Sequence, residues 1–177
     1  MFSDVFPDRT PEETQDLFNQ FVECDHWTRL HDVPPPPGCA EKLRELKDGG
    51  FRLIVLSARE HRFEDITRSY LDTFFPGIFD DAFFCNYYGK SGPKTTKADV
   101  FLEQGCFTLL DDNYKYVKNV EEETGAMCIL FGNNSWTEYH RTVDRRCRLT
   151  IKEWNELSVG AFLDLKFVYA SERNCKA

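Results

Sequence analysis

The stretch Gly49-Gly-Phe-Arg-Leu-Ile-Val-Leu-Ser57 decides how the rest of the chain is interpreted. Its two glycines end a helical pattern, and the run from Phe51 to Leu56 is typical of a strand buried on both faces of a parallel sheet. A serine follows the run directly. Strand patterns recur at 82–86, 107–110 and 126–131, and helical patterns occur at 40–47, 63–74, 95–103, 114–123 and 151–157.

This alternation of strand and helix predicts an α/β fold with a doubly wound parallel sheet covered by helices on both faces. Such sheets bind ligands at the carboxyl ends of their strands. Polar residues that directly follow a strand are therefore the first candidates for chemistry.

The chain divides into three segments. Residues 1–33 predict an accessory helix that begins at a capping box formed by Thr10 and Glu13. Four consecutive prolines then open the main α/β domain, which we assign to residues 34–160. Residues 161–177 form a C-terminal extension.

Composition excludes several classes of protein. The chain has 177 residues and a formal net charge of −8, so we expect no nucleic-acid polymer as a partner. Its longest apolar run is far shorter than the roughly 20 residues of a membrane span, so we expect no membrane association. Its start has neither a basic flank nor a long apolar stretch, which favours the cytoplasm. Seven cysteines without C-x-x-C spacing favour structural free thiols.

The first candidate site is Ser57-Ala58-Arg59, directly after the first apolar strand. A hydroxyl there, together with free N–H groups of the following turn, can hold a phosphate oxygen. The alternative is that Ser57 only caps the next helix.

The second candidate is Lys97, at the start of a helical pattern. A cation at this position can neutralise a phosphoryl group or steady a neighbouring carboxylate. The alternative is a solvated surface lysine, and Lys90 and Lys94 lie close enough in sequence to take the same role.

The third candidate is the pair Asp111-Asp112, at the end of the strand pattern 107–110. Adjacent carboxylates at a strand end suit a hard cation such as Mg²⁺, which prefers oxygen ligands. The alternative is a helix cap, because Asp is favoured there.

The order and spacing of these residues over positions 34–157 resemble the haloacid dehalogenase-like (HAD-like) hydrolase superfamily. Ser57 matches its second motif, Lys97 its third and Asp111-Asp112 its fourth. The detail is similar to nucleotidase-like members at Pro37–Leu43, Leu53–Arg59, Thr67–Phe79, Leu109–Asn113 and Gly125–Gly132 with Trp136.

The resemblance implies a Rossmann-type core with a partial N-terminal helical cap and a phosphoryl-transfer mechanism through an aspartyl-phosphate. By this likeness Ser57, with Ala58 and Arg59, would hold a phosphoryl oxygen. Lys97 would balance charge, and Asp111 and Asp112 would bind Mg²⁺.

One departure from the family pattern stands out. The first motif, a hydrophobic strand ending in Asp-x-Asp, is missing, and it would precede residue 1. Its loss would leave two inner strand edges without partners. The apolar run 161–169, with Asp164, could fill this place as a strand, although a C-terminal helix or outer edge strand is the better supported alternative.

Three functions follow from these patterns. The first is a divergent HAD-like protein that binds a small phosphomonoester, such as a nucleotide, with Mg²⁺ and has impaired phosphatase activity. The second is an active phosphatase that uses Asp164 or a residue of a partner. The third is a non-enzymatic protein-binding module on the same scaffold, which presents aromatic side chains to a protein partner: Tyr87, Tyr88, Trp136 and Tyr139.

Overall fold

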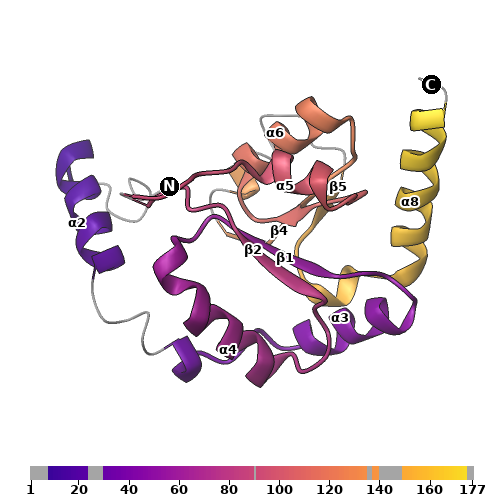
Figure 1. Cartoon of the computed structure of the whole chain (residues 1–177), viewed down its shortest axis with the longest axis horizontal. Helices are drawn as coiled ribbons and strands as arrows, with labels where there is room; N and C mark the ends of the chain where they lie inside the picture. Colours follow the sequence, from indigo (N-terminus) through magenta and orange to yellow (C-terminus); the bar gives the residue numbers. More distant parts are fainter. Residues whose placement is uncertain (1–7, 24–29, 90, 135–136, 140–148, 175–177) are drawn as a thin grey trace.

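The computed structural model describes residues 8–23, 30–89, 91–134, 137–139 and 149–174 (Figure 1). The helices are α2 (Pro11–Glu23), α3 (Cys39–Asp48), α4 (Glu64–Phe74), α5 (Lys97–Glu103), α6 (Tyr114–Thr124) and α8 (Val159–Asn174), with short 3₁₀ helices η2 (His61–Phe63) and η3 (Trp154–Glu156). The strands are β1 (Ile54–Ser57), β2 (Asp81–Phe84), β3 (Leu110–Asp111), β4 (Ile129–Phe131) and β5 (Leu149–Ile151).

The strands form two separate sheets. One has the order β1-β2 and the other β3-β4-β5, and every pairing in both is parallel. The predicted mixed α/β architecture with parallel strands is therefore confirmed. The expected single sheet is replaced by two half-sheets, because β1 and β3 each pair with a strand on one side only.

Helices cover both faces of the larger half-sheet, as β4 shows. Cys128 and Leu130 belong to a buried cluster with residues of α5 and α6. Ile129, between them, belongs to another cluster with residues of α3 and α8. Alternate side chains of a strand point to opposite faces, so β4 is buried on both. Figure 1 shows α5 and α6 on the opposite side of β1 and β2 from α3 and α4.

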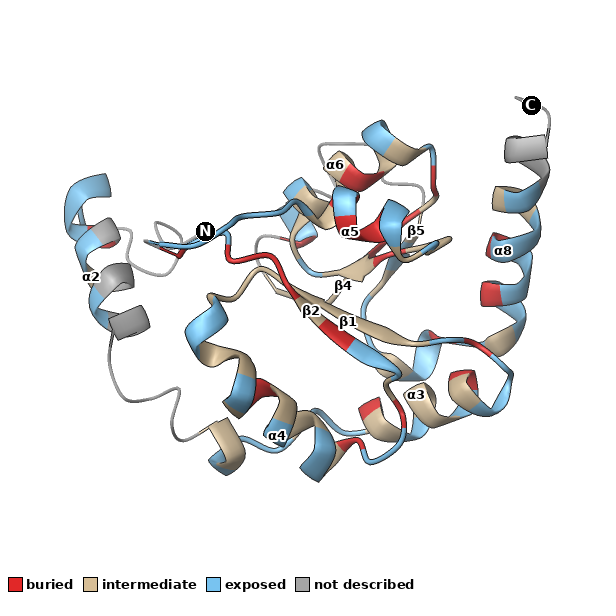
Figure 2. Cartoon of the chain, viewed as in Figure 1, coloured by how far each residue is buried: buried red, intermediate tan, exposed pale blue. Residues whose placement is uncertain are grey.

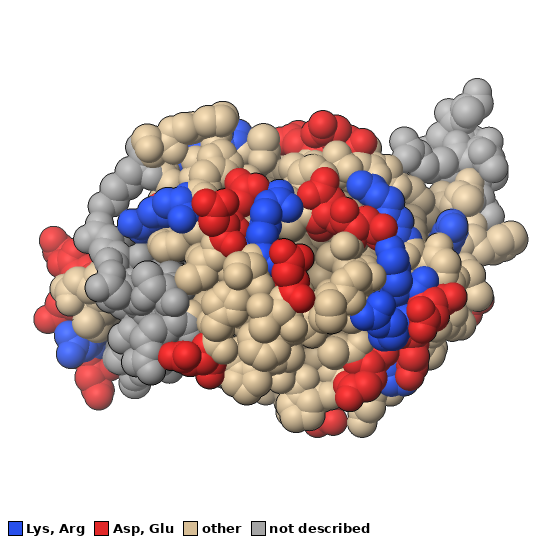
Figure 3. All heavy atoms as spheres, turned by 60° about the horizontal axis from the view of Figure 1, so that its bottom comes forward, with Lys and Arg blue, Asp and Glu red and all other residues tan. Residues whose placement is uncertain are grey.

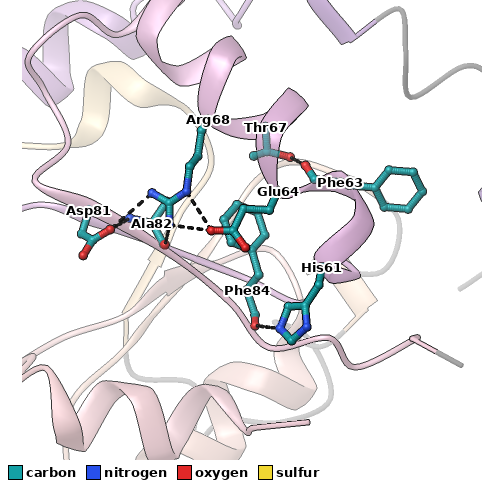
Figure 4. Close-up of polar contacts among 8 residues, drawn as sticks. All are labelled: His61, Phe63, Glu64, Thr67, Arg68, Asp81, Ala82 and Phe84. Atoms are coloured by element: carbon teal, nitrogen blue, oxygen red, sulfur yellow. Dashed lines mark hydrogen bonds and ion pairs between the residues drawn. The ribbon is translucent and has the colours of Figure 1, made fainter. Parts of the chain in front are cut away.

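Arg68 joins α4 to β2 (Figure 4). Its Nη2 donates to the Ala82 carbonyl at 2.6 Å, and its guanidinium also binds the carboxylates of Glu64 and Asp81. These bonds raise the pKa of Arg68, chiefly through the hydrogen bond to Glu64. His61 Nε2 donates to the Phe84 carbonyl at 3.1 Å, which connects the start of η2 to the end of β2.

The helix predicted at 151–157 is wrong over its first part. Residues 149–151 form β5, which pairs with β4 in the register Ile129↔Leu149 and Phe131↔Ile151. Only a 3₁₀ turn, η3, follows. Two of the three residues of β5, Thr150 and Ile151, are β-branched, which suits a strand where an open sheet edge is present.

The suggestion that 161–169 is a strand filling the sheet is wrong, because these residues lie in α8. Phe162 and Leu165 are both buried and pack in the cluster that contains Phe51. Their spacing of three residues is helical. Asp164 is exposed on this helix. The alternative of a C-terminal helix is confirmed, and the extension contributes to the core.

The capping box of α2 is confirmed. Thr10 N donates to Glu13 Oε2 at 2.8 Å, and Glu13 N donates to Thr10 Oγ1 at 3.3 Å. These bonds to Thr10 lower the pKa of Glu13. Figure 1 shows α2 standing apart from the strands. None of the helices in the described ranges is long and apolar enough to cross a membrane.

Candidate functional site

A buried ion pair joins two of the predicted site residues. Lys97 is the first residue of α5, and its Nζ lies 2.5 Å from Oδ2 of Asp111, the last residue of β3. The two side chains are only 9% and 8% exposed, so Lys97 is no surface lysine. A charge-assisted bond in such surroundings is much stronger than one in water.

Two helix starts hold this ion pair in place. Thr96 caps α5: its Oγ1 accepts from Asp99 N at 3.0 Å, while Asp99 Oδ2 accepts from Thr96 N at 3.1 Å. This fixes Lys97 in the first turn. After β3, Asn113 N donates to Asp111 Oδ1 at 2.8 Å. The cap of α6 is Asn113 itself, whose Oδ1 accepts from Lys115 N, so neither aspartate serves as that cap.

An aromatic cluster lies beside the ion pair. Lys97 Nζ is 4.7 Å from the centre of the Tyr116 ring, a cation–π distance. Burial raises the pKa of Tyr116 strongly, and the Tyr88 hydroxyl and the nearby Asp111 charge act in the same direction. Tyr87 packs edge-on against both Tyr88 and Tyr116. Since Tyr87 and Tyr88 are 44% and 46% exposed, the cluster reaches from the ion pair to solvent.

Ser57 ends β1, on the other half-sheet. Its Oγ accepts from Arg59 N at 3.2 Å, so the turn after the strand uses one of its own N–H groups internally. Its carbonyl accepts from Cys85 N at 2.8 Å. Ser57 does not cap the following 3₁₀ helix, because the residue that precedes that helix is Glu60.

The Arg59 side chain is directed toward α4. Its Nη1 donates to Thr67 Oγ1 at 2.9 Å, and Thr67 in turn donates to the Phe63 carbonyl (Figure 4). Burial lowers the pKa of Arg59. From the segment Ser57–Arg59, only the serine hydroxyl and the backbone therefore belong to the site. The Arg59 guanidinium packs against α4 instead.

Cys85 connects the two halves of the site, and the sequence alone did not single it out. It is 2% exposed. Burial raises the pKa of its thiol, and the charges of Lys97 and Asp111 also act on it, which places it near the ion pair. It bonds to Ser57 through its backbone. The thiol is thus buried and held neutral directly after β2.

Asn86, the next residue, shapes the loop that carries the tyrosines. It is 2% exposed and has a left-handed backbone with φ 54°. Its Nδ2 donates to the carbonyls of Ser91 and Pro93, and its Oδ1 accepts from His61 N. Asn tolerates left-handed backbone better than most residues, so Asn86 followed by Gly89 was the available signal in the sequence.

Asp112 is exposed at the start of the α6 turn. The described parts of the chain contain no group of three or more His, Cys, Asp or Glu side chains that could hold a metal ion. Two adjacent carboxylates still suit Mg²⁺, because this ion is commonly held by one or two carboxylates together with the phosphate of a ligand. The two oxygens of Asp111 already accept from Lys97 Nζ and from Asn113 N, so Mg²⁺ binding by Asp111 and Asp112 stays a prediction.

Three other residues from the sequence analysis have different outcomes. Lys94 Nζ donates to the Tyr87 carbonyl and supports the tyrosine loop, whereas Lys97 contacts the aspartate. Lys90 and Trp136 lie outside the described residues. On the face drawn in Figure 3, Lys and Arg are interspersed with Asp and Glu.

Comparisons of the chain with protein-family models, with curated proteins and with solved structures found no match. The interpretation of the site therefore depends on its geometry.

Proposed function

We propose that the chain is a HAD-like phosphate-binding protein, which holds a small phosphomonoester together with Mg²⁺ at the carboxyl ends of β1 and β3 and does not hydrolyse it. A nucleotide is the ligand class that the nucleotidase-like resemblance favours. The observation that carries the proposal is the buried bond between Lys97 and Asp111 at a strand end. A buried charge pair costs desolvation free energy, which points to a role other than stability.

Each residue has a defined part in this proposal. Ser57 Oγ and the adjacent backbone face a phosphoryl oxygen, and Lys97 supplies positive charge while it holds Asp111 in a fixed orientation. Asp111 and Asp112 present carboxylate oxygens to the metal. Mg²⁺, when bound with the ligand, would neutralise phosphate charge. No Asp-x-Asp pair occurs in the 177 residues, which supports binding without an aspartyl-phosphate step.

Thermal unfolding tests the proposal. We expect Mg²⁺ and inorganic phosphate, or Mg²⁺ and a nucleoside monophosphate, to raise Tm together more than either component does alone. A ligand at 100 times its Kd would stabilise the fold by about 2.7 kcal/mol. Asp112→Asn and Ser57→Ala should reduce the shift, and Asp65→Asn, an exposed change on α4, should leave it intact.

The same samples separate the alternatives. Hydrolysis of p-nitrophenyl phosphate that requires Mg²⁺ and is lost in Asp112→Asn would establish an active phosphatase. No response to Mg²⁺ and phosphate would favour the protein-binding module, for which the exposed rings of Tyr87 and Tyr88 are the supporting observation.

A further inference from the structure

A groove of about 460 Å³ separates the two half-sheets. One wall is the segment Arg52–Leu56, which contains most of β1, and the other is Gln104–Leu110, which leads into β3. We infer that this groove is a docking site for an extended, apolar segment of another polypeptide chain, which adds a parallel strand between β1 and β3. This inference does not depend on the proposed function.

The backbone of both walls is prepared for a strand. The Ser57 carbonyl bonds to the residue after β2, and alternate residues of a strand direct their backbone groups to opposite sides, so those of Ile54 and Leu56 face the groove. On the other wall, the Leu109 carbonyl accepts from Ile129 N at 2.7 Å, which turns the backbone groups of Leu110 toward the groove. An inserted strand can satisfy both edges at once, as a sheet requires.

The side chains of β1 are more exposed than is usual for an aliphatic strand in a parallel sheet. All four residues of this strand, Ile54-Val-Leu-Ser57, are of intermediate exposure, and Figure 2 shows the strand tan along its length. An unbroken aliphatic run is typical of a strand with neighbours on both sides and helices on both faces. Among the described strands, β1 pairs with β2 alone. A second neighbour would bury these side chains.

The groove lining defines the side chains of the incoming segment. Phe101 of α5 lies among the lining residues on one face. Phe51, Leu157 and Phe162 of the α3–α8 cluster lie among them on the other. Both sets are apolar, so an inserted strand has apolar residues at consecutive positions and not in alternation with polar ones.

Charge at the amino end of the groove adds a second feature. Arg52 and Lys166 both line it there. Arg52 donates to the carbonyl and side-chain oxygens of Gln104, and its charge also helps to lower the pKa of Asp80, while Lys166 lies near the Phe51 ring. An acidic residue just before the apolar run of the segment would meet these two cations. The strands in both walls pair in parallel with their neighbours, so an inserted parallel strand continues the same hydrogen-bond pattern across the groove.

A second copy of this chain is a poorer occupant. Each of the five described strands already has at least one neighbour in its own sheet, and the 161–169 run is helical. A segment that enters the groove needs two free edges. Within the described residues, no strand has both edges free, so a copy would have to unfold part of itself to supply the insert.

The test uses the unaltered chain and three synthetic peptides. The first has two acidic residues followed by six apolar β-branched residues and a polar tail. The second is the same peptide with N-methyl groups on alternate backbone nitrogens, and the third has the reversed sequence. We expect the first to bind and raise Tm, and the other two to bind at least ~10-fold more weakly by calorimetry.

A variant gives a second measurement. Ile54→Lys, in the groove wall, should weaken binding of the first peptide, and Val33→Lys, at an exposed site 61% open to solvent, should not. If the first peptide does not bind at about 1 mM, or if N-methylation leaves the affinity unchanged, the inference is wrong. Sedimentation as a dimer that the first peptide dissociates would assign the groove to a second copy and overturn it as well.

Discussion

Strands β1, Ile-Val-Leu-Ser, and β4, Ile-Leu-Phe, both begin with apolar residues but differ strongly in burial. In β4, Ile129 and Leu130 are 2% and 0% exposed, because the strand has neighbours on both sides and helices on both faces. In β1, no residue is fully buried. An apolar strand in a parallel sheet is therefore buried by its neighbouring strands as much as by the helices above and below it.

The helices show the same contrast. Those that flank β3 begin with side-chain caps, Thr96 for α5 and Asn113 for α6. Those beside β1, α3 and α4, have no side-chain hydrogen bond at their caps. The starts of the helices around β3 are therefore better defined by local hydrogen bonds than those of the helices beside β1.

Breaking the buried ion pair should have the largest effect on the β3 half. Lys97→Met leaves the Asp111 carboxylate buried without its cation, which should cost about 3–5 kcal/mol of unfolding free energy in urea titrations. The double variant Lys97→Met/Asp111→Leu should recover much of this loss. Lys118→Met, at a more exposed lysine of α6, is the control. A single variant as stable as that control would contradict the description of the pair.

Matched truncations compare the two strands directly. Ile129→Ala in β4 should cost about 2–5 kcal/mol, because it removes fully buried methyl groups and leaves a cavity. Ile54→Ala in β1 should cost less than about half as much, since its site is already partly open. Equal losses in urea unfolding would mean that β1 is as well packed as β4.

The helix caps give a smaller effect. Thr96→Ala removes the acceptor for Asp99 N and should cost about 1 kcal/mol of unfolding free energy. It should also displace Lys97 from its bond to the aspartate. Thr73→Ala, at an exposed site within α4, should change stability by less than about 0.5 kcal/mol. A cap variant that matches this control would show that the capping box contributes nothing.

The smallest effect concerns pH at the start of β1. Bonds from Lys47 and from Leu53 N lower the pKa of Asp80 below its ordinary value of 3.8. Its contribution to stability is therefore complete above pH 3.8 and is lost as the pH falls through the lowered value. The deficit of Asp80→Asn should shrink in acid. Asp72→Asn, exposed on α4, should show no such trend, and a constant deficit for Asp80→Asn would contradict the assignment.

Local chemistry made much of the fold predictable. The capping box of Thr10 and Glu13 and the glycine that ends α6 depend on neighbours within a few residues, so they could be inferred from the sequence. The predicted strand bounds are less accurate: of the pattern 107–110 only Leu110 lies in β3, and of 126–131 only the second half lies in β4. The division into two half-sheets could not be inferred, because strand pairing depends on contacts between distant segments. The C-terminal helix resembled a strand, since its apolar residues form a nearly continuous run.

The site was predictable to a similar degree. The order of residues brought Lys97 and Asp111 forward as candidates, and the structure joins them. It did not reveal that Arg59 turns to Thr67, or that Cys85 is buried and bonds through its backbone to Ser57. Both depend on how α4 and β2 pack, which no local pattern encodes.

Amide hydrogen exchange, resolved by residue in the chain alone, can show whether β1 and β3 have unpaired edges that face the groove. With a free groove between β1 and β3, the amides of Ile54, Leu56 and Leu110 should exchange more than ~10-fold faster than that of Leu130. The Leu130 amide lies in a strand paired on both sides and should be among the slowest. Uniformly slow exchange of all four would show that the two half-sheets are joined in solution, and would contradict the account.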